Sequence, residues 1–299
     1  MEINKSPANP ILTVITPTFN ESKNIPSLFE RMTKVLESLG MAWEWLIIDD
    51  HSFDDTFQKI QALASGYPNI RGVRLSSNSG THKASFCGLE ISTGACSIIL
   101  ASDLQDPPEL IPELFKEWQK GAQVVWAARN RREGESFTKK SASKVYYMIM
   151  KNFVGISNAS PLGADFFLLD KKVQQALNKY GETHVSILAL ISKLGFRQKT
   201  IYYDKQQRVH GHSGWTLDKK VKLLLDSVIA FTFKPIRFMS YLGFLTALTG
   251  FAYALIVFQN AYLGNPAEGW SSLMVVTLII GGTQMIMLGG LGEYLWRTS

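Results

Sequence analysis

The N-terminal part of the chain, up to Ala127, repeats one pattern, in which a short apolar run ends in polar residues and a stretch with helical periodicity follows. The apolar runs, rich in β-branched and aliphatic residues, are Ile11–Thr16, Trp45–Ile48, Ile70–Leu75, Ser97–Leu100 and Val124–Ala127. The helical stretches are Ile25–Leu39, about 54–65, about 80–89 and Leu110–Lys120. Strands that alternate with helices predict an α/β domain whose mostly parallel sheet is covered on both faces. Right-handed crossovers bring the carboxyl ends of such strands to one edge, where ligands bind.

One segment at this edge, Ala101–Glu109, carries the clearest chemical signal. It places Asp103, Gln105 and Asp106 after a buried strand, and two prolines then stop the strand and start a helix. A carboxylate in this position can hold Mg²⁺ or Mn²⁺, which in turn holds a diphosphate. Taken alone, the segment fits an acidic loop before a proline-started helix equally well.

Composition and motifs narrow the kind of partner. The first half of the chain has neither G-x-G-x-x-G nor G-x-x-x-x-G-K-[ST], which argues against a Rossmann dinucleotide site and a P-loop. The formal charge of +6 suits an anionic partner such as a nucleotide or a lipid phosphate. Nucleic acid fits poorly, because no zinc-finger or RNP pattern is present. Cys87 and Cys96 form no C-x-x-C pair and are expected to be buried thiols in a reducing compartment.

The middle of the chain offers groups for an anionic acceptor. Basic residues of the segment 128–140 include Arg129, Arg131 and Lys140. Arginine forks suit bidentate contact with phosphate, although a solvated loop is the usual fate of a charge run. Further on, Asp165 precedes an apolar run, where burial would raise its pKa and suit it to proton transfer. A structural aspartate that caps a turn is the alternative.

Two long apolar stretches, 236–258 and 272–294, are each long enough to span about 30 Å of hydrocarbon. The segment 216–235 mixes lysines with leucines and predicts an amphipathic helix that lies on a membrane surface. The connector 259–271 has no Lys or Arg, so the positive-inside rule places it outside and both flanks in the cytoplasm. Core helices of a soluble protein are the alternative.

Four motifs lie in order along the chain. They are Thr16-Pro17-x-x-Asn20-Glu21, Asp49-Asp50-x-Ser52-x-Asp54, Asn78-x-Gly80 and Asp103-Leu104-Gln105-Asp106-Pro107-Pro108-Glu109. Together they resemble the family 2 glycosyltransferases of GT-A fold. The last motif looks like the form found in the polyisoprenyl-phosphate glycosyltransferases, which include dolichol-phosphate mannose synthases and bactoprenol glucosyltransferases. The resemblance covers about residues 11–235 and is specific for the family, not for the sugar.

The resemblance implies a role for individual residues. The nucleotide-sugar would be bound by Pro17, Asn20, Glu21, Asp50, Asn78 and Asp103. The Asp50 carboxylate can accept a hydrogen bond from an N–H of the base, although a turn before a helix cap at Asp54 is an alternative reading of this motif. Asp103 and Gln105 would hold the metal, and Asp165 would lie beside the acceptor as the candidate base. The acceptor phosphate would be bound by Arg129, Arg131, Lys140, Arg208 and Ser213, the last two in an Arg-x-x-Gly-x-Ser loop.

These inferences predict a membrane-anchored enzyme with three parts. A cytoplasmic GT-A catalytic domain would span residues 1–215, a juxtamembrane amphipathic helix 216–235, and a two-helix transmembrane region 236–299. By resemblance, the enzyme would transfer one glucose from UDP-glucose to undecaprenyl phosphate at the cytoplasmic membrane face, with inversion. The resemblance also implies a homo-oligomer such as a tetramer.

Two departures from the family pattern leave other functions open. Ala101 stands where close relatives often carry Asp, so a non-catalytic relative that binds lipid phosphate or a partner stays an alternative. Gly214 stands where the family often has Lys, which weakens the expected grip on phosphate. A processive polysaccharide synthase is the enzymatic alternative, but it would normally show Gln-x-x-Arg-Trp, a motif that this chain lacks.

Overall fold

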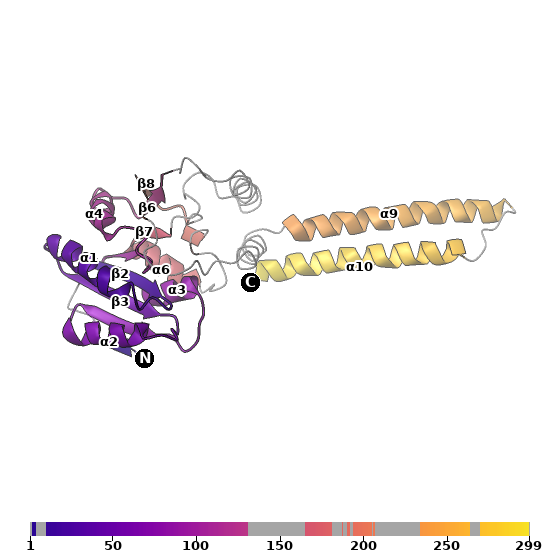
Figure 1. Cartoon of the computed structure of the whole chain (residues 1–299). Coiled ribbons are helices and arrows are strands. Elements are labelled where there is room, and N and C mark those ends of the chain that lie inside the picture. Colours follow the sequence, from indigo (N-terminus) through magenta and orange to yellow (C-terminus); the bar gives the residue numbers. More distant parts are fainter. Residues whose placement is uncertain are drawn as a thin grey trace. The chain divides into compact units, whose positions relative to one another are not determined.

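The computed structural model describes residues 2–3, 10–130, 165–180, 187, 190–191, 194–204, 206, 234–263 and 270–298. The chain forms two compact units, Met1–Ser227 and Val228–Ser299. The first unit holds a sheet flanked by helices, and the second holds a pair of long helices (Figure 1). The predicted boundaries at 215 and 235 lie outside the described residues or at their limit and stay a prediction.

Eight strands of the described part of the first unit form one sheet in the order β1-β4-β3-β2-β5-β7-β6-β8. The strands are β1 (Glu2–Ile3), β2 (Leu12–Thr18), β3 (Trp43–Asp49), β4 (Ile70–Arg74), β5 (Cys96–Ile99), β6 (Val124–Arg129), β7 (Phe166–Asp170) and β8 (Gln198–Tyr203). The central run β4-β3-β2-β5 is parallel, and so is the pair β6 and β8. Because β7 runs antiparallel to both β5 and β6, it begins at the edge where those two strands end.

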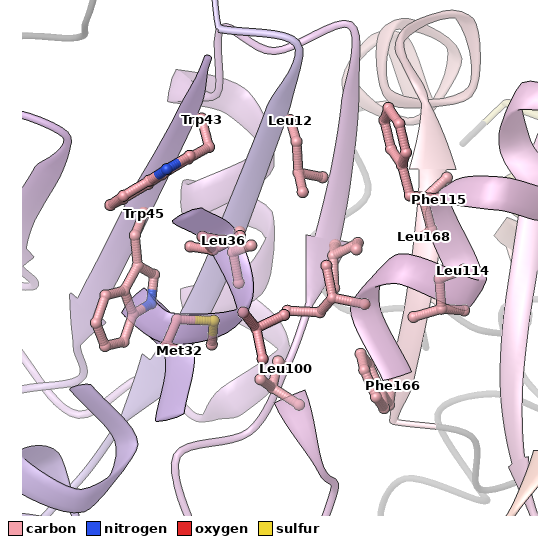
Figure 2. Close-up of a cluster of buried hydrophobic side chains, with 14 of the residues drawn as sticks. Leu12, Met32, Leu36, Trp43, Trp45, Leu100, Leu114, Phe115, Phe166 and Leu168 are labelled. Carbon is pink, nitrogen blue, oxygen red and sulfur yellow. The ribbon is translucent and has the colours of Figure 1, made fainter. Parts of the chain in front are cut away.

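Helices cover both faces of this sheet, as predicted. They are α1 (Ile25–Ser38), α2 (Thr56–Gly66), α3 (Thr81–Ile91), the 3₁₀ turn η1 (Pro108–Leu110), α4 (Ile111–Gln119) and α6 (Lys171–Tyr180). On one face, Met32 and Leu36 of α1 pack in the same cluster as Trp45 of β3 (Figure 2). On the other face, α3 approaches so closely that a Cβ at Gly88 would clash with Ile15 Cγ2 of β2. Every residue of β2 and β3 is buried, which is typical of a sheet covered on both sides.

The strands and helices expected between Ile11 and Ala127 are all present, and most of their ends differ only slightly from the expected bounds. Strands β1, β7 and β8 and helix α6 were not predicted. Helix α1 begins at Ile25 with Asn24 in the capping position, and no side chain caps it.

The second unit consists of α9 (Lys234–Tyr262) and α10 (Trp270–Thr298). The spans Ser240–Asn260 and Leu273–Gly292 are apolar and long enough to cross a membrane, and most of their residues are exposed rather than buried. That exposure argues against core helices of a soluble protein. Small residues line the contact between the helices: a Cβ at Gly282 would lie 2.5 Å from the Ala247 backbone nitrogen. Of the predicted amphipathic segment 216–235, residues 216–233 lie outside the described residues, and Lys234 and Pro235 belong to α9.

Candidate functional site

The carboxyl ends of the parallel strands carry the polar residues that the sequence singled out. Thr18, the last residue of β2, pairs with Asp49, the last residue of β3, and the Asp50 amide donates to the Thr18 carbonyl at 2.8 Å. The Leu75 amide, just after β4, donates to the Asp49 carbonyl at 2.9 Å. The Leu100 amide, just after β5, donates to the Ile15 carbonyl at 3.0 Å. The four predicted motifs therefore start from one edge of one sheet.

The loop after β2 is tied to the loop after β3. Asn20 adopts a left-handed backbone with φ 54°, and its Oδ1 accepts a hydrogen bond from the Phe53 amide at 2.9 Å. Its own amide donates to Ser52 Oγ at 2.9 Å, and the Glu21 amide donates to Thr56 Oγ1 at 2.9 Å. Asn20 and Glu21 thus hold the loops after β2 and β3 together, in addition to any contact that they make with a ligand.

The two aspartates that end β3 have different partners. Asp49 is fully buried, and its carboxylate lies 3.4 Å from the guanidinium of Arg74 on β4. Asp50 is 3% exposed, and its two oxygens accept hydrogen bonds from the amides of Ser79 at 2.7 Å and Gly80 at 2.8 Å. Burial raises the pKa of the Asp50 carboxyl, although the two amide donors oppose this effect. Asp50 therefore holds the loop that leads into α3, the loop that also presents the exposed Asn78.

Aromatic rings lie beside this pair of loops, a feature that sequence reasoning missed. Phe53 is 79% exposed, and its ring lies 6.0 Å from the ring of Phe19 and 6.0 Å from that of His51. Exposed ring faces near a buried carboxylate can stack on a flat ligand while the carboxylate accepts its N–H. The sequence does contain a signal for these rings, because each of the two polar motifs includes an aromatic residue, Phe19 in the first and Phe53 in the second.

The loop after β5 makes a tight turn. Leu104 has a left-handed φ of 57°, which is uncommon for a bulky residue and costly unless the surroundings hold it. Its side chain is 2% exposed and packs in the hydrophobic core, which holds the turn in place. Asp103 Oδ1 accepts a hydrogen bond from the Gln105 amide at 3.1 Å, so both predicted metal ligands lie on the same turn.

The oxygen atoms that this turn offers as metal ligands suit a divalent cation that a substrate helps to bind. Carboxylate and amide oxygens from Asp103 and Gln105 are ligands that Mg²⁺ accepts. Among the residues that the structure describes, no group of three or more His, Cys, Asp and Glu side chains could hold a metal ion. This turn offers two ligands, and a diphosphate and water are of the kind that can supply further ones.

A second cluster lies where β5, β6 and β8 end and β7 begins. Arg129, at the end of β6, has Nη2 3.6 Å from Asp165 Oδ2 and 3.9 Å from Asp106 Oδ1. Tyr203, the last residue of β8, donates its hydroxyl to the same Asp106 oxygen. Burial lowers the pKa of Arg129, but the neighbouring carboxylates and Tyr203 outweigh this effect, so the pKa of Arg129 is raised. Burial next to Asp106 also raises the pKa of Tyr203.

The structure corrects one expectation about this cluster. Asp165 was expected to be buried among apolar residues, but its side chain is 57% exposed. The reason is that β7 begins at Phe166, so Asp165 lies just before the strand, at the open edge of the sheet. The premise of a carboxyl buried in an apolar setting is therefore wrong, and the exposed carboxylate lies instead beside an arginine.

Four of the predicted acceptor residues cannot be placed. Arg131, Lys140, Arg208 and Ser213 lie outside the described residues. Among the predicted site residues that the structure does describe, two groups are distinct. One lies at the ends of β2 and β3, where the loops of Asn20 and Asp50 are joined, and the other is the pair of Arg129 and Asp165. Asp103 and Gln105 share the turn after β5, and Asp106 of the same loop lies beside Arg129.

Comparison with known proteins decides the family. A family profile described as Glycosyl transferase family 2 matches residues 13–177. The chain belongs to this family. It is a glycosyltransferase, as the motifs at the edge of the sheet predicted.

Relatives match over nearly the whole chain. An uncharacterized glycosyltransferase of Synechocystis sp. is 34% identical over 287 residues, which cover 96% of this chain and 90% of the relative. A prophage bactoprenol glucosyl transferase homolog of Escherichia coli is 31% identical, and the alignment covers 96% of this chain and 94% of the relative. A bactoprenol glucosyl transferase of Shigella phage SfX is also 31% identical, with coverage of 96% and 94%.

Solved structures agree on the fold of this family 2 glycosyltransferase. Mannosyl-3-phosphoglycerate synthase from Rubrobacter xylanophilus superposes with a TM-score of 0.51 at 16% identity, over 73% of this chain and 71% of that one. Glucosyl-3-phosphoglycerate synthase from Mycobacterium tuberculosis, solved with Mn²⁺, uridine diphosphate and phosphoglyceric acid, gives 0.50 at 18% identity, over 77% and 84%. The predicted GT-A-like fold is thereby confirmed.

Proposed function

We propose that this glycosyltransferase transfers a single sugar from a nucleotide-sugar to a polyprenyl phosphate at a membrane surface. One observation carries the proposal. The same chain combines a turn with oxygen ligands for a cation at Asp103 and Gln105, an arginine beside a carboxylate at Arg129 and Asp165, and two exposed apolar helices long enough to cross a membrane. The names of relatives that align over almost the full length point to the same acceptor class.

The donor nucleotide would bind at the ends of β2, β3 and β4. Asp50 is already fixed by the Ser79 and Gly80 amides, and a carboxylate oxygen has a second lone pair with which it can accept an N–H of the base. Pro17, Asn20, Glu21 and Asn78 complete this part of the site in the proposal. Shared hydrogen bonds between the loops after β2 and β3 support this common binding region.

The diphosphate would lie over the turn after β5. Asp103 and Gln105 would hold Mg²⁺ or Mn²⁺ there, and a bound cation neutralises the charge that develops on the leaving diphosphate. Asp103 and Gln105 would keep the diphosphate oriented, because their turn is fixed by the buried side chain of Leu104. Ala101, at a position where the resembled family often has Asp, would leave the ion more dependent on the substrate.

The acceptor phosphate would bind beside Arg129. The ion pair between Arg129 and Asp165 is solvent-exposed, and such pairs contribute little to stability. A lipid phosphate could therefore take the place of Asp165 at the guanidinium at small cost. The phosphate oxygen is already anionic at neutral pH and can attack directly, so Asp165 needs only to orient it or to accept a residual proton. Arg131, Lys140, Arg208 and Ser213 remain proposed ligands of the same phosphate.

The finer details of the proposal rest on resemblance. Glucose from UDP-glucose, undecaprenyl phosphate as acceptor, inversion at the anomeric carbon and assembly as a homo-oligomer are carried over from the polyisoprenyl-phosphate enzymes. The absence of Lys and Arg from 259–271 supports two membrane spans with the catalytic unit in the cytoplasm.

Membranes that contain the protein test this proposal directly. They are incubated with Mg²⁺, undecaprenyl phosphate and each of a panel of radiolabelled nucleotide-sugars, and the lipid phase is counted. One nucleotide-sugar should label the lipid phase above control membranes that lack the protein. Absence of label with every donor, at any Mg²⁺ or Mn²⁺ concentration, would favour the non-catalytic alternative that Ala101 keeps open.

A further inference from the structure

A buried hydrogen bond joins the end of β8 to the loop after β5. Tyr203 and Asp106 lie 97 residues apart in the sequence, and the Tyr203 hydroxyl donates to Asp106 Oδ1. Tyr203 is 6% exposed and Asp106 is 2% exposed. Both side chains are thus almost completely withdrawn from solvent. A buried carboxylate is costly unless it is hydrogen-bonded, so this contact keeps Asp106 in one place.

From Asp106 the contacts lead outward to groups that a substrate can reach. Arg129 Nη2 lies 3.9 Å from Asp106 Oδ1 and 3.6 Å from Asp165 Oδ2. The side chains become more exposed along this path, from 2% for Asp106 to 36% for Arg129 and 57% for Asp165. The path therefore has a fixed buried end and an accessible outer end.

A second link joins the same two segments. The Gln206 amide donates to the Gln105 carbonyl at 3.0 Å. Arg31 of α1 binds Glu109 through two hydrogen bonds of 2.9 and 2.6 Å and reaches Gln206 Oε1 at 3.2 Å. The chain that leaves β8 is thus attached at two points to the loop that carries Asp103.

We propose that Tyr203 and Asp106 are positioning residues for the acceptor phosphate and that they act through Arg129. The proposal rests on the proposed function, because it takes Arg129 as a ligand of that phosphate. Arginine has many rotamers, and a fixed carboxylate behind its guanidinium selects the few that face the acceptor. Without the Tyr203 hydroxyl, Asp106 loses a buried hydrogen bond, and Arg129 then faces a less firmly held partner.

The test compares two neighbouring tyrosines of β8 in the full-length protein. Tyr203→Phe removes the buried hydroxyl, and Tyr202→Phe makes the same chemical change at a side chain that is 68% exposed. For each variant, calorimetry in detergent measures the Kd for undecaprenyl phosphate and the Kd for UDP with Mg²⁺. We expect Tyr203→Phe to raise the Kd for undecaprenyl phosphate about tenfold, as loss of one hydrogen bond would. Its Kd for UDP, and both constants of Tyr202→Phe, should stay within about twofold of the wild type.

A double variant shows whether the effect passes through Arg129. In an Arg129→Gln background, Tyr203→Phe should cause no further loss of affinity for undecaprenyl phosphate. Should Tyr203→Phe fail to fold, Asp106→Asn replaces it, since its amide oxygen still accepts the Tyr203 hydroxyl but no longer attracts Arg129 by charge. The proposal is overturned by an unchanged Kd for undecaprenyl phosphate, by an equal loss of UDP affinity, or by a full tenfold loss in the Arg129→Gln background.

The same measurements separate this proposal from the proposed function. A wild-type protein that binds undecaprenyl phosphate but transfers no sugar to it would refute the proposed function, whereas the tyrosine comparison would still decide the positioning role. A wild-type protein that does not bind undecaprenyl phosphate would refute both.

Discussion

Replacing Asp50 with asparagine tests the nucleotide site at its most buried carboxylate. Both oxygens of Asp50 accept backbone hydrogen bonds, from Ser79 at 2.7 Å and from Gly80 at 2.8 Å. Asparagine keeps one acceptor and turns the other into an NH₂ donor that faces an N–H. One charge-assisted hydrogen bond is lost, which costs about 1.5–3 kcal/mol. The burial that raises the pKa of Asp50 also penalises its charge, and the neutral amide relieves that penalty.

We expect the Asp50→Asn variant to lose some stability and much of its affinity for UDP. The free energy of unfolding should fall by about 1–2 kcal/mol, near the lower end of the range for such a bond, because relief of desolvation offsets part of the loss. The Kd for UDP with Mg²⁺ should rise by about tenfold or more, since the loop at Gly80 loses its anchor and the base loses a charged acceptor. Chemical denaturation and calorimetry measure the two quantities on the same preparation.

Asp55→Asn is the matched control, because Asp55 lies a short way further along the same loop with a side chain that is 60% exposed. This change should leave the Kd for UDP unaltered. An Asp50→Asn variant that loses stability but binds UDP as tightly as the wild type would show that Asp50 only stabilises the fold and does not bind the nucleotide.

Three further predictions concern the metal, the helix pair and the topology. Metal affinity should be negligible without nucleotide and measurable with it, and Ala101→Asp should increase this affinity. Asp103→Ala should abolish sugar transfer. Transfer by Asp103→Ala in the presence of EDTA would refute the metal role. Gly282→Ala should lower the thermal stability of the helix pair while Gly281→Ala does not, because only the first Cβ would meet a backbone within 4 Å; equal melting temperatures would contradict this packing. A single cysteine placed between residues 260 and 270 of the connector should react with an impermeant thiol reagent in intact cells, and labelling only after permeabilisation would contradict the proposed orientation.

The pattern between Ile11 and Ala127 was enough to predict the larger part of the sheet. Its strands are short, apolar and β-branched, and each of the central ones ends in polar residues. Hydrophobic periodicity and residue composition therefore predict the same element at each position. The cluster around Asp50 follows from that topology alone, because parallel strands share one edge. What a linear pattern could not show is that both oxygens of Asp50 are already used by the Ser79 and Gly80 amides.

The rest of the sheet was beyond such reasoning. Strand β7 joins in the opposite direction between β5 and β6, and β8 pairs with β6 although the two strands lie far apart in the sequence. The apolar residues after Asp165 predicted a buried carboxyl, but the strand begins only at Phe166 and leaves the carboxyl at the edge. The contact between Asp106 and Tyr203 depends on this long-range pairing, and no local signal in the sequence indicates it.

The central claim is the transfer of one sugar to a polyprenyl phosphate. The most direct test is mass spectrometry of the lipid formed by the purified protein with undecaprenyl phosphate, Mg²⁺ and the nucleotide-sugar that the labelling panel selects. The account predicts a single product, undecaprenyl phosphate that carries one sugar residue, formed together with free nucleoside diphosphate. A ladder of products with successive sugars would indicate a processive synthase, and release of nucleoside diphosphate without any glycosylated lipid would contradict the account.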